Sequence, residues 1–259
     1  MWRFFVILWV WSLVSLSVCG QELWVVHSKN LNRADSTWVF VPANAGAEKL
    51  PVVILLHGYG GKPRAFGVGL DLARLADSLR IVFVCPDGLF DSWYFDSKFV
   101  PGSNYEQFFF ADFLPQLLRQ FPTDAKRVCI DGFSMGGHGA VFLASRHPDL
   151  FLAAGSISGT LDLEFSGLRN TSLSKHLGAY NRKIWWPFMA IAGLKNLHTV
   201  PLIVSCGLSD PLLPASRRFV EQAHKQGIMP TYIEAQGKHD GRFVASQIMA
   251  HIHFFESHF

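Results

Sequence analysis

Short apolar runs alternate with amphipathic segments along most of the chain. A continuous β-branched run bounded by turn residues predicts a buried strand, whereas apolar positions that recur every three or four residues predict a helix. Strands are expected in the runs ELWVVHS (22–28), STWVFVPA (36–43), PVVILL (51–56), IVFVC (81–85), RVCIDG (127–132), FLAAGSISG (151–159), PLIVSCG (201–207) and TYIEA (231–235).

Helical spacing appears between these runs. Its apolar positions are Leu72, Leu75, Ala76 and Leu79; Phe109, Phe113, Leu117 and Phe121; Phe219, Val220 and Ala223; and Val244, Ile248, Ile252 and Phe255. This alternation predicts an α/β fold with a mostly parallel central sheet flanked by helices on both faces, preceded by an antiparallel pair of strands. Gly159–Val200 lacks a clean strand pattern, so we expect it to be an inserted lid within a single domain, residues 21–259.

Composition narrows the class of protein. Among 259 residues, 49% are hydrophobic and 17% are charged, which supplies a sizeable core and argues against disorder. The formal net charge is only +3 and no basic block occurs, so nothing indicates a nucleic-acid partner.

The first twenty residues, MWRFFVILWVWSLVSLSVCG, combine one arginine with an apolar run and small residues at the end. This pattern predicts a signal peptide cleaved before Gln21, and therefore export to the periplasm or the medium without a stable membrane span after cleavage. Two alternatives stay open. The segment is an uncleaved anchor, or it is a lipoprotein signal that uses Cys19, because LSVC resembles a lipobox.

The remaining cysteines are Cys85, Cys129 and Cys206, and all lie in apolar runs expected to be buried strands. Their spacing matches no metal site, so we interpret them as buried apolar side chains. One disulfide is open to an exported chain, but the odd count leaves at least one thiol unpaired.

A glycine-flanked serine follows the strand expected at 127–132. Gly132-Phe133-Ser134-Met135-Gly136 fits G-x-S-x-G, the nucleophile elbow of the α/β-hydrolase fold, in which a serine occupies a strained turn between a strand and a helix. The helix-like sequence after Gly136 supports this interpretation. The pattern therefore predicts an α/β-hydrolase fold with Ser134 as its nucleophile.

A serine hydroxyl needs a base to accept its proton and an acid to orient that base, and in this fold the order along the chain is serine, acid, histidine. Asp210 follows a late strand and is the favoured acid, with Asp162 as its rival. His239 follows the last strand in a glycine-flanked loop and is the favoured base.

The other histidines fit the role of base less well. His138 on the elbow helix, and His251, His253 and His258 on the closing helix, are expected to pack or to meet solvent. His57 at a strand end is expected to hold its loop.

An oxyanion hole must stabilise the negative charge that develops on the substrate's carbonyl oxygen, and each backbone N–H donor is worth about 3–4 kcal/mol. Met135, the residue after the nucleophile, is one expected donor. The glycine-rich loop HGYGG (57–61) offers the other, for which we assign the N–H of Tyr59, with Gly60 as the alternative.

Several motifs occur together in one order: LLHGYGG, SWYFDS, GFSMGGHGA, CGLSDPLL and GKHDG. From Pro51 onward the chain resembles the esterase D-like serine esterases, which include feruloyl and acetylxylan esterases, tributyrin-type esterases, S-formylglutathione hydrolases and mycolyltransferases. The resemblance implies the same triad and oxyanion donors. It also implies that the SWYFDS loop, with Trp93 and Asp96, borders the substrate pocket.

Several residues around the expected pocket have an alternative role or depart from the pattern of the relatives. Many relatives carry an aromatic residue two positions after the base, where this chain has Gly241. For four aromatic residues, ordinary packing is the alternative to stacking on a ligand: Trp93, Tyr94, Trp185 and Trp186. Asp96 could instead hold its own loop together.

The resemblance implies a serine carboxylic-ester hydrolase that uses neither a metal nor an organic cofactor, and the predicted signal peptide implies that it is exported. An acyl-enzyme on short-chain acyl, acetyl or feruloyl esters is expected, with a small molecule or a polysaccharide as the ester. The alternatives are acyl transfer to a sugar or lipid acceptor by the same triad, and a non-enzymatic binding relic of the fold.

Overall fold

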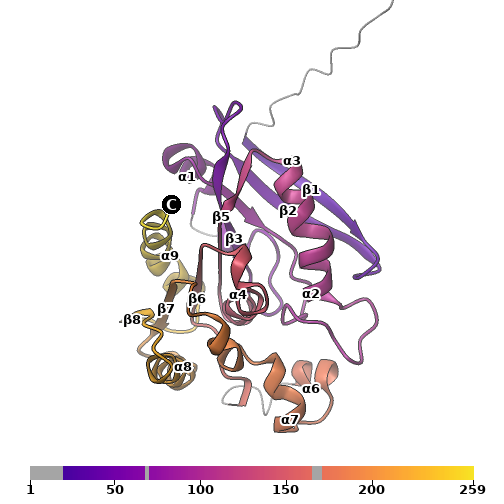
Figure 1. Ribbon diagram of the computed structural model, residues 1–259, viewed down its shortest axis with the longest axis vertical. Coiled ribbons are helices and arrows are strands. Elements are labelled where there is room, and N and C mark those ends of the chain that lie inside the picture. The colour runs from indigo at the N-terminus through magenta and orange to yellow at the C-terminus, as the bar shows by residue number, and fades with distance from the viewer. Residues whose placement is uncertain (1–19, 68–69, 165–170) are drawn as a thin grey trace, which may run out of the picture.

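A central sheet of eight strands organises the computed structural model, which describes residues 20–67, 70–164 and 171–259 (Figure 1). The strand order is β1-β2-β4-β3-β5-β6-β7-β8. The strands are β1 (Gly20–Ser28), β2 (Arg33–Val41), β3 (Leu50–Leu56), β4 (Val82–Cys85), β5 (Thr123–Gly132), β6 (Ala153–Ile157), β7 (Leu202–Gly207) and β8 (Thr231–Ala235).

Strand direction reverses on both sides of β2, which runs against its two neighbours, β1 and β4. β1 pairs with β2, and β2 with β4, in the antiparallel sense, whereas β3 to β8 run parallel to one another and to β4. This arrangement confirms the predicted α/β-hydrolase fold. The carboxyl ends of the parallel strands meet at one edge of the sheet, where loops from different strands come together.

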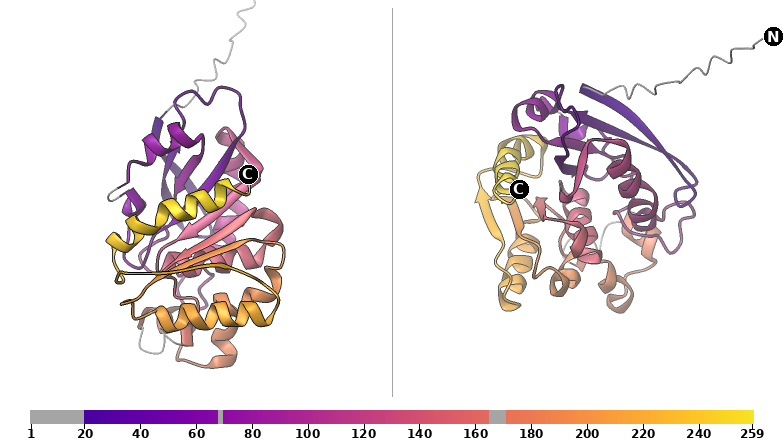
Figure 2. Two further views of the ribbon diagram at one scale, coloured as in Figure 1. Left: turned by 90° about the vertical axis from the view of Figure 1, so that its left-hand side faces the viewer. Right: turned by 45° about the horizontal axis from the view of Figure 1, so that its top comes forward.

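Helices cover both faces of the sheet (Figure 2). On one face, apolar side chains of α1 (Leu72–Leu79) and α9 (Gly241–Glu256) pack against the sheet. On the other lie α4 (Met135–Arg146), α8 (Leu213–Lys225) and one continuous helical stretch. That stretch consists of α2 (Tyr105–Gln107), a π-helical turn (Phe108–Phe113) and α3 (Leu114–Gln120).

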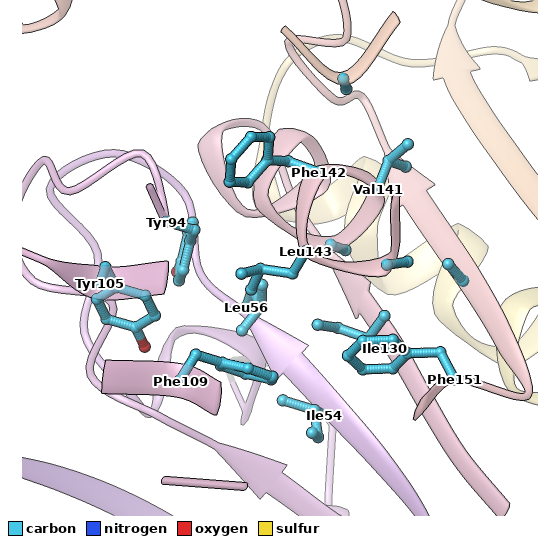
Figure 3. Close-up of a cluster of buried hydrophobic side chains, with 14 of the residues drawn as sticks. Ile54, Leu56, Tyr94, Tyr105, Phe109, Ile130, Val141, Phe142, Leu143 and Phe151 are labelled. Atoms are coloured by element: carbon cyan, nitrogen blue, oxygen red, sulfur yellow. The ribbon is translucent and has the colours of Figure 1, made fainter. Parts of the chain in front are cut away.

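The helix that follows the predicted elbow is almost wholly buried. Figure 3 shows side chains of α4, among them Leu143, close to Leu56 of β3 and Ile130 of β5, with Phe109 nearby. All four side chains are fully buried in one cluster. Because so much apolar surface surrounds it, α4 gives the turn before it a rigid support.

The segment between β6 and β7 contains no strand among its described residues, 158–164 and 171–201. It contains α6 (Thr171–Leu177), α7 (Arg182–Trp185) and two 3₁₀ segments, Trp186–Phe188 and Ala190–Asn196. The Leu161 carbonyl accepts a hydrogen bond from the Ile191 N–H (3.0 Å), so the start of the segment contacts its second 3₁₀ segment. Its role as a lid stays a prediction.

The predicted signal peptide lies outside the described residues, apart from Gly20 at the start of β1. Within the described ranges, no helix is both long enough and apolar enough to cross a membrane. Cys85, Cys129 and Cys206 are free and buried.

Candidate active site

Ser134 lies at the junction between β5 and α4 in a backbone conformation that few residues adopt. Its φ is +57° and its ψ is −114°. Such a conformation costs of order 1–3 kcal/mol and persists only where neighbouring structure enforces it. Here the Ser134 N–H donates to the Ile157 carbonyl (3.0 Å), and the Phe133 N–H donates to the Leu56 carbonyl (3.0 Å). The turn is thereby attached to the strands on both sides of β5.

The two glycines of the motif are required by close backbone contacts. A Cβ on Gly136 would collide with the Leu56 carbonyl oxygen, and a Cβ on Gly132 would collide with the backbone of Gly136. The glycines therefore allow α4 to begin directly against β3, which leaves the half-buried Ser134 side chain at the sheet's carboxyl edge.

Three side chains from separate loops meet at this edge. The Oγ of Ser134 lies 2.8 Å from the Nε2 of His239, and the Nδ1 of His239 lies 2.9 Å from the Oδ2 of Asp210. The His239 side chain is 28% exposed and that of Asp210 is fully buried. We call Ser134, His239 and Asp210 the candidate triad.

Hydrogen bonds keep the Asp210 carboxylate ionised. Burial raises its pKa, but hydrogen bonds from His239 and from the backbone N–H of Leu212 (2.8 Å) favour the charged form, and the net result is a pKa below the usual range. An ionised carboxylate only accepts hydrogen bonds, so Nδ1 of His239 carries the proton. Nε2 is then free to accept the proton of the Ser134 hydroxyl.

The rival acid, Asp162, is engaged elsewhere. Its buried carboxylate lies 2.9 Å from the Nη1 of Arg218 and accepts a hydrogen bond from the Glu164 N–H (3.0 Å). Burial is the main reason why its pKa is raised. The structure therefore brings Asp210, and not Asp162, to His239.

The loop after β3 approaches the elbow from the side. A Cβ on Gly58 would lie 3.3 Å from the Cβ of Ser134. The Gly60 N–H donates to the Phe90 carbonyl (2.7 Å), which removes it as an oxyanion donor. In the part of the chain that the structure describes, the Tyr59 N–H has no acceptor.

Met135 is the first residue of α4, where a backbone N–H has no acceptor within the helix. The two N–H groups predicted to stabilise the oxyanion are therefore both available.

The SWYFDS loop (92–97) is hydrogen-bonded to the HGYGG loop (57–61), which we call the oxyanion loop. Its backbone is strained at two residues. Trp93 and Tyr94 have φ of +54° and +61°. The Tyr94 hydroxyl donates to the His57 carbonyl (2.8 Å), and Nε2 of His57 accepts from the Gly88 N–H (2.9 Å). Since Nδ1 of His57 contacts the Gly58 carbonyl (2.8 Å), both ring nitrogens hold the loop, in agreement with the expected role.

The two predicted pocket residues have partners within the protein. Trp93 is buried, and its indole N–H donates to the Ser172 hydroxyl (2.7 Å). The Asp96 carboxylate accepts from the backbone N–H (3.1 Å) and the side-chain amide (2.9 Å) of Gln107, so it holds its own loop. A substrate contact for either residue stays a prediction.

His138 packs, as expected for a histidine on the elbow helix. Its ring is fully buried and stacks on Phe142, and its Nε2 lies 2.8 Å from the Phe188 carbonyl of the inserted segment. Burial lowers the pKa of His138 to about 4. The histidine is therefore neutral and donates to Phe188, which ties α4 to the insertion.

Two aromatic residues that the sequence pattern did not single out touch the site. The Phe133 ring packs on the His239 imidazole with centroids 4.8 Å apart, and Phe90 packs edge-on against Tyr59 at 5.1 Å. Phe133 occupies a variable position of G-x-S-x-G, so the motif alone carries no signal for it. No motif indicates Phe90 either, because its contact with Tyr59 depends on how two separate loops pack together.

Among the described residues, no three His, Cys, Asp or Glu side chains gather closely enough to hold a metal ion.

Several solved structures share the fold. A ferulic acid esterase is 24% identical with a TM-score of 0.78, and the alignment covers 93% of this chain and 100% of that one. An S-formylglutathione hydrolase from Agrobacterium tumefaciens is 24% identical (TM-score 0.81; 92% and 95% covered). MPT51 (FbpC1) from Mycobacterium tuberculosis is 18% identical (TM-score 0.78; 93% and 99% covered).

The family comparison goes further than the fold. Residues 28–240 match the model of the Esterase family, described as "Putative esterase", and this range includes the nucleophile elbow and the predicted acid and base. The chain therefore belongs to the Esterase family and is a carboxylic-ester hydrolase.

Proposed function

We propose that this protein is an exported serine esterase that cleaves short-chain acyl, acetyl or feruloyl esters through the candidate triad. The observation that carries the proposal is the continuous hydrogen-bonded chain from Ser134 through His239 to Asp210. An activated serine requires a base within hydrogen-bond reach and an acid that orients the base, and this geometry meets both conditions.

The reaction follows from the positions of these atoms. The Oγ of Ser134 attacks the ester carbonyl carbon while Nε2 of His239 takes the hydroxyl proton. The N–H groups of Tyr59 and Met135 stabilise the oxyanion. As the carbon–oxygen bond to the alcohol breaks, His239 returns the proton to the leaving oxygen, and the acyl group remains on Ser134.

Water completes the cycle. His239 removes a proton from a water molecule, which attacks the acyl-enzyme, and the acid departs as Ser134 regains its proton. Throughout, the buried Asp210 carboxylate holds the imidazole in one tautomer and stabilises the imidazolium that forms transiently. The partly exposed His239 ring is consistent with access for both ester and water.

Exposed aromatic rings next to the oxyanion loop support a substrate with a bulky part. Tyr59 is 48% exposed and Phe90 is 62% exposed, and their rings contact each other. Aromatic faces of this kind pack against sugar rings and against feruloyl groups. This is why the proposal extends beyond acetyl esters to feruloyl esters and to esters of polysaccharides.

Hydrolysis of p-nitrophenyl esters from acetyl to octanoyl by the purified protein tests the proposal. We expect turnover that prefers short chains, and Ser134→Ala should lower kcat by at least about 10⁴-fold because it deletes the nucleophile. Circular dichroism should show that this variant keeps its fold. Equal turnover by Ser134→Ala would refute the assignment.

Two further measurements test whether the acyl group is transferred to an alcohol acceptor and whether the N-terminal signal is cleaved. Acyl products that form only when a sugar or lipid alcohol is added would mean acyl transfer instead of hydrolysis. Intact-mass measurement of protein recovered outside the cytoplasm should give a chain that starts at Gln21. A lipid-modified Cys19 at the N-terminus would instead indicate a lipoprotein.

A further inference from the structure

A second chain of aspartate, histidine and serine side chains lies away from the candidate triad, between the sheet and α9. The Nδ1 of His251 lies 2.8 Å from the Oδ2 of Asp131, and its Nε2 lies 2.9 Å from the Oγ of Ser205. All three residues are fully buried. We call them the buried triad. The order of atoms and the distances match those of the candidate triad.

Burial excludes this group from catalysis, because no ester can reach a serine with no exposed surface. Stability alone does not account for it either. A buried carboxylate and imidazole are costly to remove from water, and well-packed apolar side chains of the same volume are often as stable or more stable. Fully satisfied polar networks do, however, specify one arrangement of the elements that they join.

The elements joined here are those that carry the candidate triad. Asp131 belongs to β5, and its Oδ1 accepts a hydrogen bond from the backbone N–H of Gly132 (2.8 Å), the first residue of the elbow. Ser205 belongs to β7, which leads to the Asp210 loop, and its carbonyl accepts from the Ser158 N–H (2.7 Å).

His251 connects the third element. It belongs to α9, whose N-cap residue Asp240 directly follows His239 and accepts hydrogen bonds from the backbone N–H groups of Arg242 and Phe243 (3.0 Å each). The helix that begins beside the proposed base is therefore held by His251 to both β5 and β7.

The strand between β5 and β7 leaves room for this connection. Gly155 of β6 lies beside the buried triad, and a Cβ there would lie 2.6 Å from the Asp131 Oδ1 and 2.9 Å from the His251 Nδ1. The absence of a side chain at Gly155 lets Asp131 and His251 meet across β6.

We propose that Asp131, His251 and Ser205 are positioning residues for the reaction. They fix the ends of β5 and β7 and the start of α9 relative to one another, so that the Ser134 hydroxyl, the His239 ring and the Asp210 carboxylate meet at hydrogen-bond distance. This inference rests on the proposed function of the candidate triad. It concerns residues that contact neither substrate nor reacting atoms.

Ser205→Ala is the first test, because it removes one hydroxyl from the network with little change in volume. We expect the rate at which diisopropyl fluorophosphate modifies Ser134 to fall about tenfold or more, since small misalignments of reacting groups are costly. For p-nitrophenyl acetate, kcat should fall similarly while KM stays unchanged. Ser145→Ala is the matched control, because the Ser145 hydroxyl is also buried but donates to the Phe142 carbonyl of its own helix (2.7 Å).

A spectroscopic readout reports the alignment directly. The Nδ1 proton of each triad histidine should give a far-downfield proton resonance, assigned by its loss in His239→Gln or in His251→Gln. In Ser205→Ala, the His239 resonance should shift or broaden, whereas Ser145→Ala should leave it unchanged. A wild-type His239 resonance together with a wild-type modification rate in Ser205→Ala would overturn the proposal.

The double variant Asp131→Leu, His251→Leu separates alignment from stability. Apolar replacement should leave a cooperatively folded protein, yet modification of Ser134 should be slowed as in Ser205→Ala. A wild-type rate in this folded variant would also overturn the proposal. If the wild-type protein itself fails to react with the fluorophosphate, the proposed function fails instead, so the two failures are distinguishable.

Discussion

The candidate triad and the buried triad consist of the same three types of side chain at nearly the same hydrogen-bond distances, but their surroundings differ. The histidine of the first is 28% exposed and that of the second is fully buried. Ser134 occupies a strained turn at a strand end, whereas Ser205 sits within a regular strand. Hydrogen-bond geometry alone therefore does not make a serine a nucleophile. A reactive serine also needs access and oxyanion donors.

The largest expected effect breaks the candidate triad at its acid. Asp210→Asn should lower kcat about 10⁴-fold with the fold intact, because an amide no longer selects the productive histidine tautomer. The measurement is steady-state hydrolysis of p-nitrophenyl acetate. Asp162→Asn is the matched control and should stay within about threefold of the wild-type rate. The reverse pattern would move the acid to Asp162.

Asp35 is a further buried carboxyl group, but it contacts a hydroxyl group instead of a histidine. Burial raises the pKa of Asp35 to about 7, although a hydrogen bond from the Thr37 hydroxyl (2.9 Å) favours the charged form. The folded protein therefore holds this proton more tightly than the unfolded chain. Its contribution to stability is present below about pH 4 and is lost as pH rises to about 7.

Asp35→Asn should remove this loss. The free energy of unfolding of the variant should exceed that of wild type by about 2–4 kcal/mol at pH 8, and the difference should vanish near pH 4. Urea denaturation at both pH values measures this difference.

His138 has the opposite effect on the pH dependence of stability, because its lowered pKa makes stability rise with pH between about 4 and 6.5. Since it is common to both proteins, it cancels from the difference, and a gap that does not change with pH would contradict the prediction.

A smaller loss of stability is expected when a side chain fills the space that Gly155 leaves beside the buried triad. Gly155→Ala should lower the free energy of unfolding by about 1–3 kcal/mol, because the new methyl group overlaps Asp131 and His251. Thermal and urea unfolding measure it. Gly241→Ala is the control, since a Cβ there meets nothing within 4 Å. Equal stability of both variants would mean that the buried triad tolerates displacement.

Much of the fold could be predicted from local sequence. Each strand of the described residues overlaps an apolar run, and the signal is plainest for β3, β4, β6 and β7, because a strand buried on both faces is continuously apolar. The elbow was recognisable because its constraint is local: Gly132, Ser134 and Gly136 are set by contacts within one turn and its neighbouring strand. Asp210 and His239 could be proposed as acid and base because each follows a predicted strand, and the carboxyl ends of parallel strands meet at one edge of the sheet.

Only the tertiary structure could decide which distant groups meet. His251 lies 120 positions from Asp131 and 46 from Ser205, and on its own helix it resembles any other histidine of an amphipathic pattern. The use of the Gly60 N–H by Phe90 likewise depends on how two loops dock. Local periodicity encodes which face of an element is buried. It does not encode the register and orientation at which elements pack, and these determined the buried triad.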